Sequence, residues 1–570
     1  MELRDSLLTA LSKLPGTRDF HLHLLVSAPR KYADLYPYIT PRPRTALQDI
    51  LILLSEQPTP DAPRVFVAAI EAYVYVIPST ASAIMYIAKV DSTGQGLFPS
   101  PVSTLVKALV GFYVDPDLTT RDKKGVLPRW VQNIWVHVFA RAQNQYLFPN
   151  SVEWAGKAVL SDVKLCSWWK RILGEVAAEV EGRKGLAAPA EQITATGPSA
   201  ETQKTTVRLH YILPGYNELE AIQSLHDRSS PSAPQDPTAS TTPISWIYGH
   251  PYSQGDDGVP LPGPFSGASQ QRPRHLGEVI PYFDDDPKSR FLDEIAYTDT
   301  QPAGGAKSSE RKRARKGSVK DGLDAEIKGD DDLEAKGDSD RAPPPKVMGE
   351  LAQVSADEFW ERMSFRQECV AGAVTGFFTL IIHTNATTND KVSTAPTSAL
   401  ASSTELVSSA LAPRSGQVSA QIVKRVMTLL TTSVEFSTLE RSVRGTEAAE
   451  GLIKGLCEGL TLPMSGGGRI RPPVSRDQQR REQKTPEPGS SSSAPMYLAP
   501  PRTPPPSKGR AVGKDSISPN PFDEPELTLN TYHSYIYGKV MVRNPEAVRK
   551  KDLGKKEEIV QVLAVRKKKK

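Results

Sequence analysis

The 570-residue sequence predicts an α/β fold, in which a central mixed β-sheet is surrounded by helices. Runs of β-branched and aromatic residues with the length of strands gather early in the chain, whereas segments with apolar residues at helical spacing follow later. Polar stretches rich in Pro, Ser and charge separate these segments and lack the apolar residues that a core needs. We therefore expect one core that is interrupted by a loop of about 50 residues.

The N-terminal elements are predicted to be a short helix and three strands. Leucines recur at helical spacing over residues 3–14 and predict an amphipathic helix. Residues 21–26 predict the first strand. Residues 65–77 are β-branched and aromatic, and together with residues 82–90 they predict a hairpin. A polar turn follows at residues 91–94.

The middle of the chain predicts three helices and two strands. Apolar residues on one face predict a helix at 105–112, and residues 130–142 and 161–178 predict two more. Residues 205–213 predict a strand. A strand-like segment at 243–248 lies inside a loop rich in Ser, Pro and Gly.

Later elements are predicted to be helices. Ser355 and Glu358 have the spacing of a capping box and mark a helix start. The apolar run 369–382 has about 14 residues, which is too short to cross a bilayer and suits a buried helix. Residues 418–430 and 448–459 predict two further helices.

Composition divides the chain into a folded domain at 1–460 and a largely disordered basic tail at 461–570. An insertion at 301–347 is charged and almost free of aromatic residues, so we expect it to be disordered. Basic runs at 311–316 and 566–570 are typical of nuclear-localisation or nucleic-acid-binding segments, or of solvated tails.

Composition and missing motifs limit the class of protein. The net charge is +5, and the three cysteines, Cys166, Cys369 and Cys457, lie too far apart for a disulfide framework or a zinc site. Neither a signal peptide nor a membrane-spanning run is present, and the metalloprotease, Walker, dinucleotide-fold and hydrolase-elbow motifs are absent. We expect a soluble, intracellular, nuclear protein that binds no metal.

The acidic run at 284–286, followed by Pro287 and Lys288, admits two interpretations. Packed carboxylates repel one another, so a buried one resists ionisation and can act as a general acid or base near neutral pH. Asp and Pro also start helices, where the helix dipole favours negative charge. Both interpretations stay open on residue types alone.

Three further segments are candidates for a binding site. Trp168 and Trp169 project about 100° apart on one helix, so at most one faces the core squarely. The other lines a pocket or an interface, unless both are partly buried packing residues. Tyr146, at the predicted end of a helix, is either a cleft hydroxyl or a core residue. Residues 99–103 precede a helix, whose exposed N–H groups suit a pyrophosphate.

These segments, taken in order, resemble one family. They are Glu71–Val76, Ala88–Gly94, Arg141 with Gln145–Pro149, Trp168–Trp169, Asp285–Phe291, Phe359–Trp360 and Arg366–Glu368. The chain resembles the fungus-specific histone H3 lysine acetyltransferases, which act with histone chaperones and are similar in fold to CBP-type acetyltransferases. The resemblance extends over residues 68–460 without the insertion and implies a single CBP-like acetyltransferase core.

The resemblance implies catalytic roles for matching positions. Asp286 matches the catalytic acid/base, with Asp285 beside it, and both Asp91 and Trp169 match residues needed for activity. Lys288 matches a lysine that becomes acetylated on the enzyme itself.

The chemistry that this implies needs particular groups. A neutral amine attacks a thioester, so a base must take the amine proton and a donor must stabilise the developing oxyanion. Asp286 is the candidate base, or it orients the substrate lysine instead. Tyr146 or backbone N–H groups are the candidate donors.

The resemblance also implies acetyl-CoA as the acetyl donor and no metal. The expected contacts are Val90, Asp91, Ser92, Pro99, Ser100, Pro101, Val102, Ser103, Phe139, Gln143, Ala158, Val159, Leu160 and Trp168. Gln143 stands where the family has a small residue, and Asp284 stands where it has a proline.

The implied function is acetylation of lysines in the core and tail of newly made H3, as H3–H4, in replication-coupled nucleosome assembly, with links to the DNA damage response and transcription regulation. Implied partners are histone chaperones of the anti-silencing and Nap families, with no membrane and no direct DNA readout. The alternatives are a non-catalytic chromatin or chaperone-binding scaffold and a different CoA-dependent acyltransferase. The retained residues Asp91, Trp168, Trp169, Asp286 and Lys288 argue against the scaffold.

Overall fold

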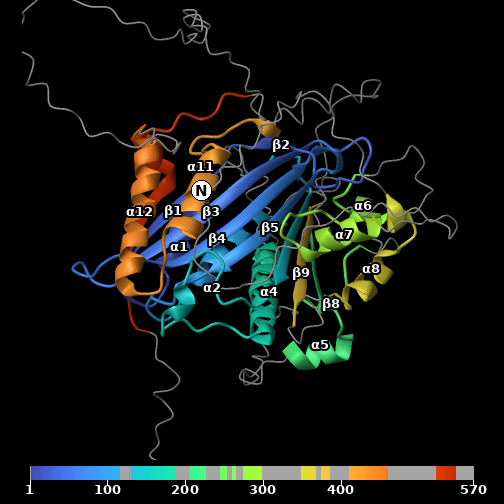
Figure 1. Cartoon of the computed structure of the whole chain (residues 1–570), viewed down its shortest axis with the longest axis horizontal. Helices are drawn as coiled ribbons and strands as arrows, with labels where there is room; N and C mark the ends of the chain where they lie inside the picture. The colour runs from blue at the N-terminus through green and yellow to red at the C-terminus, as the bar shows by residue number, and fades with distance from the viewer. Residues whose placement is uncertain are drawn as a thin grey trace, which may run out of the picture. The chain divides into compact units, whose positions relative to one another are not determined.

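The computed structural model describes most of the predicted domain and one segment of the predicted tail (Figure 1). The described residues are 2–115, 127–128, 130–186, 205–225, 244–252, 260–264, 274–297, 348–366, 374–384, 410–459 and 522–546.

A ten-stranded mixed sheet forms the centre of the described part of the chain. Its strand order is β10-β1-β3-β4-β5-β6-β9-β7-β8, with β2 paired to β3. The β5–β6 and β7–β8 pairs are parallel, and the other pairs are antiparallel. The strands are β1 Gly16–Val26, β2 Arg30–Tyr32, β3 Thr45–Gln57, β4 Val65–Ile77, β5 Ser82–Asp91, β6 Asn133–Ala140, β7 Thr205–Ile212, β8 Trp246–Tyr248, β9 Gly376–Thr384 and β10 Tyr537–Asn544.

Helices cover both faces of this sheet (Figure 1). One face packs against α1, α2, α4 and α5. On the opposite face, α11 and α12 cover β1 and β3, while α6, α7 and α8 cover β5, β6 and β9. The helices are α1 Leu3–Leu11, α2 Val102–Val114, α4 Asp162–Leu186, α5 Glu218–Leu225, α6 Leu276–Val279, α7 Pro287–Tyr297, α8 Ala356–Met363, α11 Ala420–Thr428, α12 Leu439–Cys457 and α13 Leu529–Thr531.

The predicted fold class is confirmed, and so are most of the predicted elements. The leucines of α1 are buried at the predicted spacing, and β4 and β5 form the predicted antiparallel hairpin. The acidic run leads into α7, as the helix-start interpretation expects. At α8 the Ser355 side chain accepts a hydrogen bond from the Glu358 N–H, as the capping pattern predicts.

Two helix predictions are wrong. Residues 130–142 contain strand β6, and the apolar run 369–382 contains most of β9, so Tyr146 follows a strand rather than a helix. These strands pair with each other in the interior of the sheet, and nearly all their residues are buried. A strand covered on both faces loses the apolar–polar alternation that marks a half-buried strand, so its sequence is easily mistaken for a buried helix.

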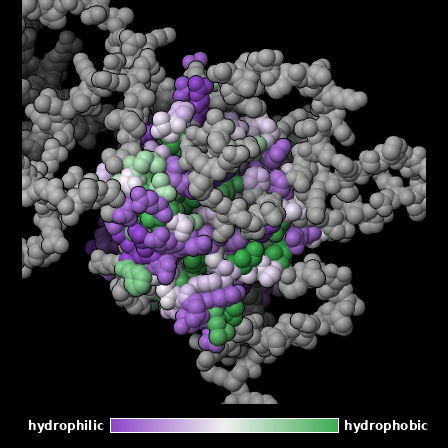
Figure 2. Space-filling model, turned by 90° about the vertical axis from the view of Figure 1, so that its right-hand side faces the viewer, coloured by the Kyte–Doolittle hydropathy of each residue, from purple (hydrophilic) through white to green (hydrophobic). Residues whose placement is uncertain are grey.

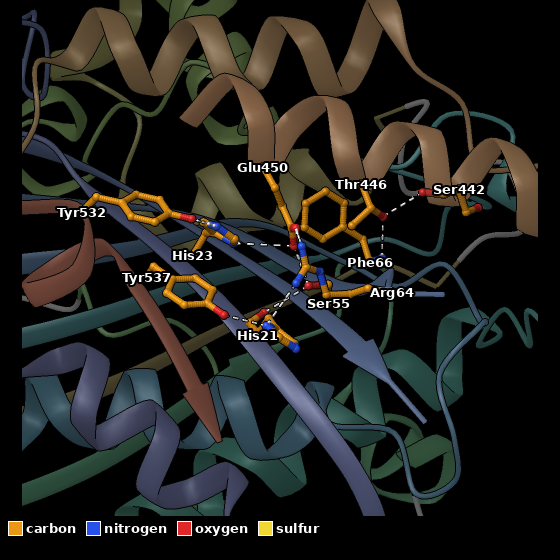
Figure 3. Close-up of polar contacts among 10 residues, drawn as sticks. All are labelled: His21, His23, Ser55, Arg64, Phe66, Ser442, Thr446, Glu450, Tyr532 and Tyr537. Carbon is orange, nitrogen blue, oxygen red and sulfur yellow. Dashed lines mark hydrogen bonds and ion pairs between the residues drawn. The ribbon is translucent and has the colours of Figure 1, made fainter. Parts of the chain in front are cut away.

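The predicted boundary at residue 460 is wrong for residues 522–546. Strand β10 pairs antiparallel with β1 and adds an edge strand to the sheet. The Tyr532 hydroxyl lies 3.0 Å from His23 Nε2, and the Tyr537 hydroxyl lies 2.7 Å from His21 Nδ1 (Figure 3). Composition hid β10, because half of an edge strand faces solvent and carries polar residues. The domain therefore includes a segment of the predicted tail.

Other expectations fall outside the described residues. These include the insertion at 301–347, both basic runs and Cys369. None of the helices in the described ranges is long and apolar enough to cross a membrane. On the face seen in Figure 2, hydrophilic residues are interspersed with small hydrophobic patches.

Candidate active site

A cavity of about 680 Å³ opens where the end of β5, the start of α2, the end of β6 and α4 meet. Its lining includes every residue predicted to contact acetyl-CoA except Pro99. Tyr146 and Trp169, predicted from the same resemblance, also line it. Sequence reasoning therefore assembled segments that are far apart in the chain but share one cavity.

Asp91 organises one wall of the cavity. Its Oδ2 accepts hydrogen bonds from the N–H groups of Tyr146, Leu147 and Phe148, at 2.8, 2.8 and 3.0 Å. Its Oδ1 accepts from the N–H of the next residue, Ser92, at 2.8 Å. The carboxylate is thus used to orient the loop after β6. With its side chain only 4% exposed, Asp91 lines the cavity while it directs most of its hydrogen bonds to the protein backbone.

Lys157 closes the other side of the Asp91 carboxylate. Its Nζ lies 3.0 Å from Asp91 Oδ1 and donates to Ser151 Oγ at 2.6 Å. Gly94, at φ +76°, lies directly against Lys157, and a Cβ atom there would lie 2.4 Å from the Lys157 Cα. This close approach joins the turn after β5 to the loop that carries Ala158.

The two tryptophans divide their roles as the helical spacing predicts. Trp169 is 5% exposed and belongs to the core, whereas Trp168 is partly buried. Their ring centroids lie 4.7 Å apart at an interplanar angle of 75°. Trp168 Nε1 donates to Ser103 Oγ at 2.9 Å, which ties α4 to the first turn of α2 across the cavity.

The Tyr146 hydroxyl already makes a hydrogen bond within the protein, so it is not a free donor for an oxyanion. The hydroxyl donates to the carbonyl oxygen of Arg141, within the same loop. Burial and the nearby Asp91 carboxylate raise the pKa of Tyr146 to about 12, so the group is a neutral phenol at physiological pH. Its aromatic ring therefore helps to line the cavity while its hydroxyl stabilises the loop.

The acidic run does not line the cavity among the described residues. Asp286 is fully buried at the start of α7, and its two oxygens accept from the backbone N–H and the Nζ of Lys288. The Lys288 Nζ also lies 4.6 Å from the centre of the Phe377 ring. In this structure the Asp286 carboxylate is buried and paired with Lys288, and its place facing the substrate lysine stays a prediction.

Asp285 is the member of the run that reaches the cavity wall, through Lys89. The Lys89 Nζ lies 2.7 Å from Glu71 Oε2 and 3.3 Å from Asp285 Oδ2, and Lys89 lines the cavity. Burial disfavours the Lys89 ammonium, but the two carboxylates outweigh this effect and raise the pKa of Lys89 above its ordinary value. The Asp285 side chain is 67% exposed, so it is accessible to a substrate.

Glu71 and Lys89 lie in segments that carry the resemblance, but the sequence predicts no role for them. They are cross-strand neighbours in the β4–β5 hairpin. A charged residue of opposite sign on each arm of a predicted hairpin was the signal that could have paired them. Lys157 had no comparable signal, because its contact with Asp91 joins loops 66 residues apart.

The described residues contain no group of three or more His, Cys, Asp or Glu side chains that could hold a metal ion.

Comparisons with known proteins find one family model and two curated relatives that match this chain. A family model described as the histone acetyltransferase KAT11-type domain matches residues 124–451. The chain is 29% identical over 329 residues to the histone acetyltransferase rtt109 of Aspergillus flavus, covering 57% of this chain and 46% of that protein. It is 24% identical over 334 residues to the histone acetyltransferase rtt109 of Schizosaccharomyces pombe, covering 58% of each. The chain thus spans about half the length of the curated relatives it matches.

A solved structure supports the fold. The crystal structure of Rtt109 from Aspergillus fumigatus matches with a TM-score of 0.51 at 23% identity, covering 80% of this chain and 96% of that chain. At this level of identity the match concerns the fold of the central sheet and its helices.

Proposed function

The chain belongs to the histone acetyltransferase KAT11-type family, and we propose that it transfers the acetyl group of acetyl-CoA to lysines of histone H3. The observation that carries this proposal is the cavity. Residues from β5, α2, the loop after β6 and α4, selected from residue types and from the resemblance, line one space of about 680 Å³. A scaffold with a degenerate core would have no need to keep this lining together.

The lining suits acetyl-CoA in its chemistry. Ser100 and Ser103 offer hydroxyl groups beside the start of α2, and the first N–H groups of a helix favour phosphate oxygens. Val90, Val159 and Leu160 offer apolar surface for the pantetheine chain. Trp168 and Phe139 add aromatic walls. These residues would hold the donor, and no metal is required for the transfer.

We propose that the acceptor lysine approaches from the side of Lys89 and Asp285. Its neutral amine attacks the thioester carbonyl carbon, the C–S bond breaks, and the CoA sulfur leaves as a thiolate that takes up a proton. The exposed Asp285 carboxylate is a candidate acceptor for the amine proton. Asp286 remains a predicted catalytic residue, with the geometry favouring a role in holding Lys288 and the start of α7.

We also propose self-acetylation at Lys288. Its ammonium is 3% exposed and contacts aromatic rings as well as Asp286. Acetylation would remove the buried positive charge, and with it the ion pair to Asp286 and the cation–π contacts with Phe283 and Phe377. The Asp286 carboxylate would then need a proton or another partner.

The proposed setting is the nucleus, with H3–H4 presented by histone chaperones of the anti-silencing and Nap families. The test incubates the purified chain with acetyl-CoA and H3–H4, with and without each chaperone, and locates acetyl groups by mass spectrometry. Acetylated H3 lysines would support the proposal. Absence of acetyl on H3 and on Lys288 under every condition would favour the scaffold alternative.

The base is tested by single-turnover acetylation with the Asp286→Asn and Asp285→Asn chains. Loss of the chemical step at unchanged substrate affinity would support a base role for the altered residue. Near-normal turnover with weakened substrate binding would leave that residue only the role of orienting the amine.

A further inference from the structure

A buried ion pair lies beneath the wall of the cavity, outside every segment that sequence reasoning selected. Arg18 of β1 and Glu56 of β3 approach to 3.5 Å, and each side chain is 1% exposed. Removing two charges from water is costly, and a separation of 3.5 Å is too long for the pair alone to repay that cost well. The pair must be compensated by other contacts.

Those contacts go to one turn. The Arg18 guanidinium donates to the carbonyl oxygens of Leu97 at 2.9 Å and of Pro99 at 3.1 Å. Glu56 Oε1 accepts from the Leu97 N–H at 3.0 Å. The two charged side chains thus hold three backbone groups of the turn at 96–99. Arg18 also donates to the Pro15 carbonyl at 3.1 Å, which anchors it to the start of β1.

The turn sits tightly on this pair. A Cβ atom at Gly96 would lie 2.9 Å from Glu56 Oε2, so glycine is required for the turn to approach so closely. Burial raises the pKa of Glu56, although the Arg18 charge and the Leu97 N–H oppose this effect. The contacts with Arg18 and with the Leu97 N–H hold the carboxylate in place.

The same turn forms a wall of the cavity. Gly96, Leu97 and Phe98 line it directly, and the chain then continues through Ser100 into α2. Pro99 is the one expected contact that does not line the cavity, and its carbonyl is directed to Arg18 instead. The position of Pro99 is thus explained by the buried pair.

We infer that Arg18 and Glu56 are positioning residues for acetyl-CoA, which hold the 96–99 turn in the shape that receives the donor. This inference rests on the proposed function, because it takes acetyl-CoA as the occupant of the cavity. Neither side chain lines the cavity. They order the turn before acetyl-CoA binds, so the free energy of binding does not include the entropic cost of ordering it.

The test compares Arg18→Lys and Glu56→Gln with the unaltered chain. Lysine keeps the positive charge but cannot donate to the Leu97 and Pro99 carbonyls with the fork geometry of arginine. We expect the Kd of acetyl-CoA, measured by calorimetry, to rise about tenfold in Arg18→Lys, which corresponds to the loss of one or two hydrogen bonds. Glutamine can still accept from the Leu97 N–H, so Glu56→Gln should raise Kd less, by about threefold.

The kinetic signature separates positioning from general damage. The KM for acetyl-CoA should rise with Kd, while kcat at saturating acetyl-CoA stays within about twofold, because the altered residues do not touch the reacting atoms. The matched control is Arg30→Lys, which alters another strand arginine paired with a carboxylate, Asp49, away from the cavity. That control should leave Kd unchanged.

Two outcomes would overturn the inference and leave the proposed function intact. Unchanged Kd in a folded Arg18→Lys chain, with only a lowered Tm, would reduce the pair to a stabilising role. If Arg18→Lys does not fold, unchanged Kd in Glu56→Gln would likewise reduce the pair to that role. Failure of the unaltered chain to bind acetyl-CoA would overturn the proposed function as well, so the two failures are distinguishable.

Discussion

At the scale of single residues, the clearest case is Asp91. Sequence reasoning placed it in the site, and the cavity does include it. Its carboxylate nevertheless spends its hydrogen bonds on the backbone of the loop at 146–148 and on Lys157. The resemblance could suggest that a carboxylate was needed there, but apart from Ser92 its partners lie 55 or more residues away, and no local pattern predicts them.

We predict that Asp91→Asn lowers both stability and acetyl-CoA binding. Asparagine cannot accept all these bonds, and Lys157, whose side chain is 5% exposed, would lose its counter-charge. Breaking a buried pair in this way costs about 3 kcal/mol or more. Thermal unfolding and calorimetry measure the two effects. Asp285→Asn is the control for stability, because that side chain is 67% exposed and should change the free energy of unfolding by less than about 0.5 kcal/mol.

If the Tm of Asp91→Asn equals that of the unaltered chain, this account is contradicted. Asp91 would then be a candidate for direct contact with the substrate.

At the scale of elements, prediction succeeded where residue types and boundaries agree on one element. The leucines of α1 recur at helical spacing with one face buried. Strand β4 is buried on both faces, but its β-branched and aromatic residues, ended by Pro78, still predicted it as one arm of a hairpin with β5. Prediction failed for β6 and β9, which are also covered on both faces, and it missed β3, whose residues are buried except for Gln57. A strand buried on both faces has no apolar–polar alternation, so alternation could not separate these strands from buried helices.

The contact of η5 (Tyr532–Ile536) and β10 with the sheet carries a pH prediction. His23 is 1% exposed beside Tyr532, Glu450, His21 and Arg64 (Figure 3). Burial, together with the positive charge of Arg64, lowers the pKa of His23 to about 3. Burial likewise lowers the pKa of His21 to about 4. Both histidines are therefore neutral in the folded chain at pH 6.5.

Because the folded chain lowers the pKa values of both histidines, its free energy of unfolding should fall as the pH falls. Below the unfolded pKa of about 6.5, the unfolded chain binds protons that the folded chain does not, so stability is full above pH 6.5 and falls as pH drops towards 4. His23 alone should contribute a slope of about 1.4 kcal/mol per pH unit in that window.

The measurement is the free energy of unfolding from pH 7.5 to pH 4.5, for the unaltered chain and for His23→Gln. The variant, which cannot titrate at this position, should show the shallower slope even if it is less stable overall. Equal slopes in the two chains would show that His23 is protonated as readily in the folded chain as in the unfolded one.

At the scale of the whole molecule, composition predicted where polar stretches interrupt the fold but not that the chain returns to it. The boundary at residue 460 followed a change in composition, whereas β10 lies beyond it in a polar context. A single edge strand adds few apolar residues to the totals on which such a boundary rests.

Long insertions between core elements are tolerated because the entropy of closing a loop grows only slowly with its length. We therefore predict that deleting residues 302–346 leaves the Tm nearly unchanged, and a large loss of Tm would show that this insertion is structural.

Truncation of the chain before β10 tests whether the pairing of β10 with β1 is needed for the fold. A chain ending at residue 521 loses β10 together with the buried side chains of Tyr532, Ile536 and Val542. At about 1.5–3 kcal/mol for each buried side chain, the loss is about 5 kcal/mol or more, which is a large part of the stability of an ordinary domain. It also leaves the edge of β1 unpaired and prone to aggregation.

The matched control ends at residue 546 and keeps β10 while removing the basic run at 566–570. Circular dichroism and thermal unfolding should find the chain ending at 546 folded, and the chain ending at 521 insoluble or strongly destabilised. Equal Tm values would mean that β1 does not need β10, and the domain boundary would then return to residue 460.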